Sequence, residues 1–274
     1  MSGFVDTHAH LQDQEFGDDA DEVIRQARDA GVTTLVLPAV DVASSIQGLD
    51  LARRHENVYT TAGYHPHEAS NLMAESLDSV DGLLSKDGVV AVGEIGLDFF
   101  RLHSPREAQF AAFDAMLGLA EKHRMPVILH CRDAWDEMAE RLVPWAHRAG
   151  PAFAGRPLGV MHYFTGTLEE ARRYIDLGFL ISVHTSVTHP KQEALRHVVA
   201  SLPLESLVIE TDSPYGAPQS HRGKRNEPAF VVEAARQIAI LHGVALDYIG
   251  EVTGANAGRL FGLPVTAEVT GGDG

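Results

Sequence analysis

Two histidines stand two positions apart near the start of the chain, in the segment FVDTHAH (4–10). Residues i and i+2 of a β-strand point to the same face, so a strand running into this segment would present His8 and His10 together. Two neutral imidazoles held in this way suit a divalent cation of the first transition row. Taken alone, an HxH pair is equally compatible with two structural histidines.

Further histidines and carboxylates stand where other predicted strands end. They are Glu94, His130, His162 and Asp212, which end or follow the segments VVAVGE (89–94), PVILH (126–130), LGVMH (158–162) and LVIET (207–211). Chance would scatter such residues along the chain. Their recurrence at matching strand ends therefore favours a shared metal site.

The set predicts two ions that share Glu94, because a carboxylate has two oxygens and can bridge two cations. We assign His8, His10, Asp212 and Glu94 to one ion, and Glu94, His130 and His162 to the other. Ions about 3.5–4 Å apart stabilise the attacking and leaving oxygens of phosphoryl transfer and lower the pKa of bound water. Asp212 could accept the proton of that water or orient it. Glu94 and Asp212 are therefore the predicted catalytic residues.

A basic segment, HRGKRNEP (221–228), follows the last of these strands. Its phosphate-binding candidates are Arg222, Lys224, Arg225 and Asn226. Guanidinium, ammonium and amide groups are phosphate-binding chemistry, and barrel enzymes often hold phosphate in this region. A solvated basic turn is the alternative interpretation.

The elements that must position these residues alternate along the chain. Eight short β-branched runs predict strands at 3–6, 33–40, 58–63, 89–94, 126–130, 158–162, 179–183 and 207–211. Helical spacing predicts helices at 18–30, 108–123 and 168–178. Alternating strands and helices indicate a parallel sheet. A (β/α)8 TIM barrel is favoured over a doubly wound open sheet, because no glycine-rich dinucleotide loop follows the first strand and polar residues gather at one end of the strands.

Composition limits the kinds of metal site and of binding partner that this chain can have. The chain has 274 residues, a formal net charge of −16 and one cysteine, Cys131. The single cysteine excludes an internal disulfide and a thiolate-rich zinc site, and the acidic balance argues against broad attraction to nucleic acid. We expect one barrel domain over 1–263 and a loose tail over 264–274. An acidic stretch stands at the N-terminus, and no run of about 18 apolar residues occurs. We therefore expect a cytoplasmic protein without a signal peptide or membrane span.

With these residues laid out, the chain resembles the TatD family of metal-dependent hydrolases in the amidohydrolase-like superfamily. The motifs that carry the resemblance are DTHAHL, GYHPHE, GEIGLDFF, PVILHCRDA, HYFTGT, ETDSPY, HRGKRNEP and TGANAGRLFGL. The resemblance implies a (β/α)8 barrel and a divalent-metal-dependent deoxyribonuclease, a 3′ to 5′ exonuclease. It implies that His65 contacts a substrate phosphate. The metal ligands that it implies are His8, His10, Glu94, His130, His162 and Asp212.

Two segments depart from the family pattern. ISVHTSVTHP (181–190) replaces a serine-glycine turn followed by a threonine-phenylalanine pair, and Gly216 replaces a larger apolar residue, which we expect to loosen its loop. His184 and His189, in the first segment, remain candidates for substrate contact.

Several alternatives stay open. The same metal pair could hydrolyse an amide or an ester, including the ester of an aminoacyl-tRNA, or the barrel could be a non-catalytic binding protein. The metal could be Mg²⁺, which serves phosphoryl chemistry, or a softer ion such as Mn²⁺, Zn²⁺ or cobalt. The expected partner is single-stranded DNA or a DNA 3′ end, with no membrane; the sequence leaves the oligomeric state open and is compatible with a monomer.

Overall fold

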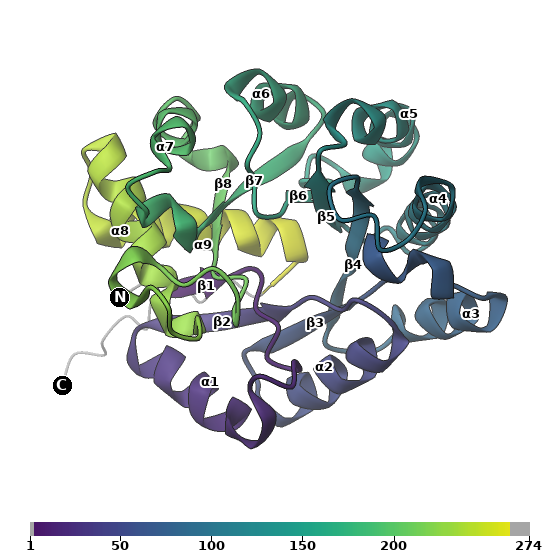
Figure 1. The fold of residues 1–274 in the computed structure, drawn as a ribbon, viewed down its shortest axis with the longest axis horizontal. Coiled ribbons are helices and arrows are strands. Elements are labelled where there is room, and N and C mark those ends of the chain that lie inside the picture. The colour runs from purple at the N-terminus through teal and green to yellow at the C-terminus, as the bar shows by residue number, and fades with distance from the viewer. Residues whose placement is uncertain (1–2, 264–274) are drawn as a thin grey trace.

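Eight parallel strands form the centre of the computed structural model, which describes residues 3–263 (Figure 1). They are β1 Phe4–Asp6, β2 Val32–Leu37, β3 Val58–Ala62, β4 Val89–Asp98, β5 Val127–Arg132, β6 Gly159–Met161, β7 Phe179–His184 and β8 Leu207–Glu210. Each strand pairs with the next in sequence. The ring closes where Thr7 N donates to Ile209 O over 3.1 Å and Asp212 N donates to His8 O over 2.8 Å. The predicted (β/α)8 barrel is confirmed.

Helices connect the strands and surround the barrel (Figure 1). The α-helices are α1 Ala20–Asp29, α2 Val42–Arg54, α3 Ala74–Leu83, α4 Arg106–His123, α5 Trp135–Phe153, α6 Leu168–Asp176, α7 Glu193–Ala200, α8 Val231–His242 and α9 Leu246–Phe261. Short 3-10 turns are η1 Gly17–Asp19, η2 Pro66–Asn71, η3 Thr185–Thr188, η4 Leu204–Ser206, η5 Gln219–His221 and η6 Pro228–Phe230. The strands and helices predicted from the sequence all form, with ends shifted by a few residues, and the predicted tail 264–274 lies outside the described residues.

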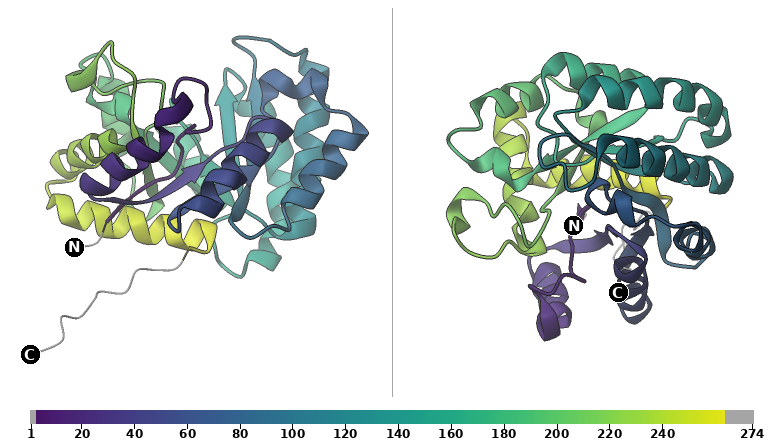
Figure 2. Two further views of the ribbon diagram at one scale, coloured as in Figure 1. Left: turned by 90° about the horizontal axis from the view of Figure 1, so that it is seen from below. Right: turned by 45° about the vertical axis from the view of Figure 1, so that its right-hand side comes forward.

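The interior of the barrel is apolar at the end opposite to the carboxyl ends of the strands. One buried cluster joins strand residues with the last helix: Val5, Val36, Ala91, Ile128, Val160, Leu180, Val208, Ala257, Leu260, Phe261 and Leu263. Helix α9 runs across this end of the barrel, as Figure 2 shows in yellow. Strands that are covered by helices outside and by this cluster inside need apolar residues on both faces, which explains why their sequences do not alternate. The polar residues are therefore left to the open end.

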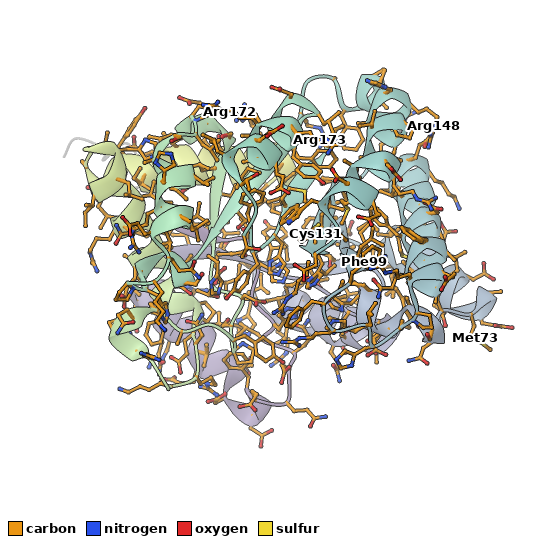
Figure 3. All side chains as sticks on the ribbon, turned by 45° about the horizontal axis from the view of Figure 1, so that its top comes forward. Met73, Phe99, Cys131, Arg148, Arg172 and Arg173 are labelled. Atoms are coloured by element: carbon orange, nitrogen blue, oxygen red, sulfur yellow. The ribbon has the colours of Figure 1, made fainter. Side chains whose placement is uncertain are left out.

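The outer layer carries the charges. Arg148, Arg172 and the 64% exposed Met73 lie at the periphery, whereas Cys131 lies near the centre (Figure 3).

Within residues 3–263 no single helix is long and apolar enough to cross a membrane. One pair of helices bent by 111°, Pro228–His242 with Leu246–Phe261, has the length and composition only when both are taken together.

Candidate metal centre

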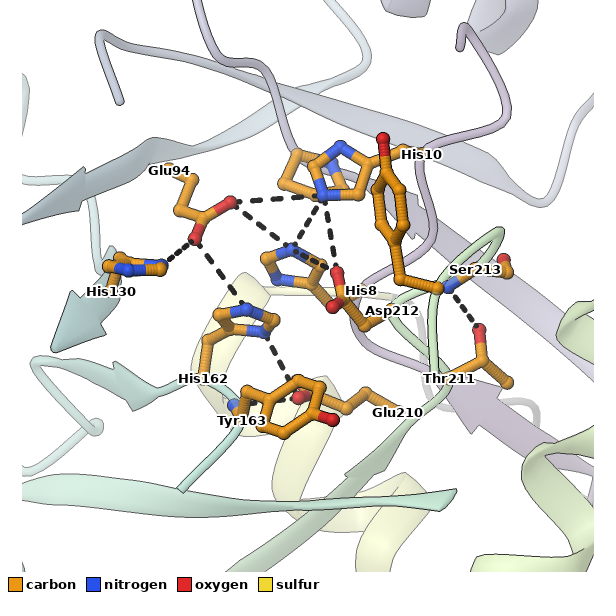
Figure 4. Close-up of polar contacts among 12 residues, drawn as sticks. His8, His10, Glu94, His130, His162, Tyr163, Glu210, Thr211, Asp212 and Ser213 are labelled. Atoms are coloured by element: carbon orange, nitrogen blue, oxygen red, sulfur yellow. Dashed lines mark hydrogen bonds and ion pairs between the residues drawn. The ribbon is translucent and has the colours of Figure 1, made fainter. Parts of the chain in front are cut away.

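A cavity of about 670 Å³ opens at the carboxyl ends of the strands. The six residues assigned to metal from the sequence come from five different strands or strand ends, and the structure brings them together at this cavity (Figure 4). Because every strand of the barrel is parallel, their carboxyl ends meet on one face. Residues that are as much as 204 positions apart in sequence, such as His8 and Asp212, thereby become neighbours.

One group of donors surrounds His8. Its Nε2 lies 3.1 Å from His10 Nε2, 3.4 Å from Glu94 Oε2 and 3.6 Å from Asp212 Oδ1. His10 Nε2 in turn lies 3.4 Å from Asp212 Oδ1 and 3.8 Å from Glu94 Oε2. The side chains of His8 and Glu94 are almost fully buried, so this group is shielded from water on one side.

A second group surrounds the other oxygen of the same carboxylate. Glu94 Oε1 lies 2.8 Å from His130 Nδ1 and 3.5 Å from both His162 Nε2 and His65 Nε2. His65 Nε2 is also 3.3 Å from His130 Nδ1. The two oxygens of Glu94 therefore face two different sets of imidazoles.

Both groups fit a divalent cation. Ligand bonds of about 2.1 Å in a tetrahedral site imply ligand-to-ligand edges of about 3.4 Å, and the separations above scatter around that length. Several lone-pair-bearing nitrogens converge without a donor that would satisfy them all, which is unfavourable unless a cation or protons lie between them. The structure groups the donors in three sets: His8 with His10 and Asp212, His8 with Glu94 and His162, and His65 with Glu94 and His130.

The electrostatics favour ionised carboxylates. Burial by itself would raise the pKa of Glu94, but His162 and the neighbouring imidazoles outweigh it and hold the pKa well below its ordinary value. Asp212 behaves in the same way, because the hydrogen bond from His10 outweighs burial and lowers its pKa. The pKa of His162 is raised to about 10, since Glu210 and Glu94 outweigh the effect of burial.

Two further carboxylates orient the imidazoles from behind. Asp98 Oδ2 lies 2.7 Å from His67 Nε2 and 3.3 Å from His130 Nε2. Glu210 Oε1 lies 3.0 Å from His162 Nδ1 and also accepts from Tyr163 N over 2.7 Å. A carboxylate behind a ligating histidine fixes its tautomer and ring direction and raises its basicity. Asp98 is not among the residues predicted from the sequence, although the segment GEIGLD places it four residues after Glu94.

Glycines allow the backbone to approach closely beside Glu94. A Cβ on Gly63 would lie 2.9 Å from the backbone of Gly93, and a Cβ on Gly93 would lie 2.8 Å from Ile128 Cβ. The strand can therefore pass between its neighbours with no side chain in the way. Glu94 N donates to Ala39 O over 2.6 Å, and this hydrogen bond fixes the backbone of Glu94.

The basic segment predicted to bind substrate is divided by the structure. Arg225 pairs with Asp19 and Glu227 at 2.8 and 3.0 Å, and its guanidinium covers the ring of Phe16. Asn226 is fully buried and donates to Thr211 O and Tyr215 O over 2.7 Å. Both side chains therefore have partners within the protein that hold the loop in place, and their contact with substrate stays a prediction.

The other two basic candidates remain exposed. Arg222 and Lys224 are exposed and have no ion-pair partner among residues 3–263. They are not among the residues that line the cavity, whose cationic members in the described chain are Arg101 and Arg132. The sequence offered one signal for Arg132: it follows His130 by two residues, so on a strand it points to the same face.

His65 lies beside the second group. It is 8% exposed, and burial lowers its pKa to about 4. Its Nδ1 accepts from His67 N over 3.1 Å, so the neutral imidazole carries its proton on Nε2, which lies 3.5 Å from Glu94 Oε1 and is a hydrogen-bond donor there.

A (β/α)8 barrel with imidazoles and carboxylates gathered at its strand ends is the architecture of a metal-dependent hydrolase. The family pattern described as TatD related DNase matches residues 5–262, and the chain belongs to this family.

Individual relatives cover nearly the whole chain. The chain is 37% identical over 264 residues to the 3′-5′ ssDNA/RNA exonuclease TatD of Pantoea ananatis, covering 94% of this chain and 99% of that protein. It is 34% identical to the uncharacterized metal-dependent hydrolase YabD of Bacillus subtilis, covering 93% and 98%. The crystal structure of YJJV, a TatD homolog from Escherichia coli, superposes with a TM-score of 0.88 at 32% identity, covering 95% and 98%.

Proposed function

We propose that this protein is a deoxyribonuclease that removes nucleotides from the 3′ end of single-stranded DNA and depends on two divalent cations. The observation that carries the proposal is the position of Glu94, whose oxygens face two separate groups of imidazoles. Two-metal sites of this kind are suited to phosphodiester hydrolysis. The name of the Pantoea relative adds single-stranded RNA as a second substrate to be tested.

The two cations would be held by six side chains. His8, His10, Asp212 and Glu94 Oε2 would hold one, and Glu94 Oε1, His130 and His162 would hold the other. When bound, such cations supply Lewis acidity and lower the pKa of water. Mixed nitrogen and oxygen donors suit Mn²⁺ or Zn²⁺, whereas Mg²⁺ would use chiefly the carboxylates.

Asp212 would act mainly as an orienting acceptor. Its low pKa makes the carboxylate a weak base, so accepting a hydrogen bond from the attacking water suits it better than removing a proton outright. Asp98 and Glu210 would hold His130 and His162 in the direction that the substrate requires.

The cavity supports action on a single-stranded end. At about 670 Å³ it has room for a terminal nucleotide and part of its neighbour, and Arg101 and Arg132 on its wall would neutralise phosphate charge. A paired strand would have to unstack before its phosphodiester could reach Glu94.

The test is product analysis over time on a 5′-labelled oligonucleotide, with chelated protein and with Mg²⁺, Mn²⁺ or Zn²⁺ added back. We expect a ladder that shortens from the 3′ end and stops when the metal is removed. A p-nitrophenyl ester, an amide panel and an aminoacyl-tRNA are assayed in parallel. If one of them is hydrolysed while the oligonucleotide stays intact, the nuclease proposal fails. If none of these compounds and no oligonucleotide is hydrolysed with any metal, the nuclease proposal fails as well.

A further inference from the structure

An exposed aromatic ring follows β4 directly and lies beside Arg132, which lines the cavity. Phe99 is buried, at 7% exposure, and its amide donates to Arg132 O over 2.9 Å, which extends the ladder between β4 and β5. The next residue, Phe100, is 60% exposed. A single exposed apolar side chain is common at a protein surface, so the exposure of this ring is of interest only because of the residues around it.

One face of this ring is covered by a cation that also lines the cavity. The guanidinium carbon of Arg132 lies 3.9 Å from the centroid of the Phe100 ring. Arg132 and Arg101 are the cationic side chains among the described residues of the cavity wall. In a protein of net charge −16, a polyanionic substrate would be attracted to this part of the wall.

The backbone of Phe100 and Arg101 is fixed relative to the metal centre by one carboxylate, that of Asp98. Asp98 Oδ1 accepts from Phe100 N over 2.9 Å and from Arg101 N over 2.8 Å. Its other oxygen contacts His67 and His130. Because a single buried side chain holds both the loop and a candidate ligand, the loop keeps its position relative to the cluster.

The distance between alternate residues of β5 is close to the distance between successive phosphates of a single nucleic-acid strand. Arg132 follows His130 by two residues, which separates their Cα atoms by about 6.6 Å along the strand. This is comparable to the distance between successive phosphates of a single strand. A phosphodiester at Glu94 and His130 would therefore leave the next phosphate near Arg132.

We propose that Phe100, Arg132 and Arg101 form a subsite for the nucleotide that adjoins the hydrolysed phosphodiester, with its base stacked on the open face of Phe100 and its phosphate paired with the arginines. The subsite rests on the nuclease function proposed above. Base stacking on aromatic rings tolerates every base, so this subsite would give affinity without sequence preference. Its loss should weaken binding about ten- to hundredfold.

The test compares Phe100→Ala with a matched control, Arg106→Gln. Arg106 lies 3.9 Å over the ring of Phe99, so the control removes an arginine-phenylalanine pair of the same geometry that does not line the cavity. Three substrates are used with the metal-loaded protein: a ten-residue oligothymidylate, the same strand without its penultimate base, and the p-nitrophenyl ester of thymidine 5′-phosphate.

We expect Phe100→Ala to raise KM for the oligothymidylate about ten- to hundredfold with kcat nearly unchanged, and to leave the abasic strand and the single-nucleotide ester unaffected. Arg132→Gln should raise KM for both strands, since it also removes a phosphate contact. Arg106→Gln should change none of the three. Equal loss on all three substrates would mean that Phe100 has only a structural role and would overturn the subsite.

Binding without turnover separates this proposal from the nuclease function. Fluorescence anisotropy with a labelled phosphorothioate oligothymidylate measures Kd for the unsubstituted protein and for Phe100→Ala. A weaker Kd in the variant supports the subsite. Equal Kd values, or no binding by the unsubstituted protein, overturn it. Failure of hydrolysis by the unsubstituted protein, by contrast, overturns the proposed function.

Discussion

Gly216 has no side chain, and the imidazole of His184 occupies the space that a Cβ at position 216 would need. A Cβ on residue 216 would overlap Cε1 of His184 and lie 2.8 Å from its Nε2. His184 is 1% exposed and stacks on Tyr163 with ring centroids 3.8 Å apart. The two departures from the family pattern therefore depend on each other. The imidazole of His184 occupies the space beside Gly216, and His184 has almost no surface to offer a substrate.

Gly216→Ala should lower the free energy of unfolding by about 2–5 kcal/mol. A residue with a Cβ at φ +64 costs about 1–2 kcal/mol, and overlap with a packed ring costs about 1–3 kcal/mol more. The matched control is Gly223→Ala at φ +83, which has nothing within 4 Å and should show the backbone cost alone. Urea denaturation measures both.

His184→Ala tests the cause of that loss. In the double variant with Gly216→Ala, the overlap disappears, so the two changes should be less than additive by about 1–3 kcal/mol. Strict additivity would show that the imidazole and residue 216 do not compete for the same space.

Glu94→Ala and Asp212→Ala should each lower hydrolysis at least about a hundredfold, because each removes a candidate ligand. The two variants should differ in metal content. Asp212 faces only the group around His8, so its loss should remove one ion, whereas Glu94 faces both groups and its loss should remove both. Elemental analysis after dialysis measures the number of ions, and circular dichroism checks the fold. Full activity in both variants would place the chemistry elsewhere.

Metal binding should release protons, and the affinity should rise with pH. The metal-free protein holds a proton on His162, whose pKa is raised to about 10, and a ligating imidazole must be unprotonated. The metal-free state thus binds more protons than the loaded state from neutral pH up to about 10, which gives a positive slope of affinity against pH over that range.

Calorimetry in two buffers of different ionisation enthalpy counts these protons. Glu210→Gln is the matched variant, because Glu210 is the main cause of the raised pKa of His162, and fewer protons should be released at pH 8. Identical binding enthalpies in both buffers would contradict the prediction.

Arg222 and Lys224 lie outside the cavity and should contact only a long substrate. Removing both should leave the hydrolysis of a dinucleotide unchanged. With a twenty-residue strand, the slope of log Kd against log salt should fall by about 1.4, at about 0.7 for each lost phosphate contact. Replacing Arg148 and Arg172 with alanine, both at the periphery (Figure 3), controls for the loss of two positive charges. An unchanged slope would show that the basic segment does not bind the strand.

The sequence by itself determined the barrel and the ends at which its polar residues gather. Runs such as 89–94 and 207–211 are apolar enough for strands buried on both faces; the first ends at Glu94, and the second is followed by Asp212. Since parallel strands share one carboxyl edge, the type of residue at each end was sufficient to predict that His8 and Asp212 would meet.

Only the tertiary structure decided how the donors are grouped and which cations are free to meet a substrate. The sequence cannot show that His65 turns into the cluster, because that depends on the path of the turn after β3 and on the packing around Glu94. It cannot show that Arg225 is already paired with Asp19 either, since a charge count does not reveal partners more than two hundred residues away. Local patterns fix the chemistry of each strand end, whereas distances between side chains arise from the closure of the barrel.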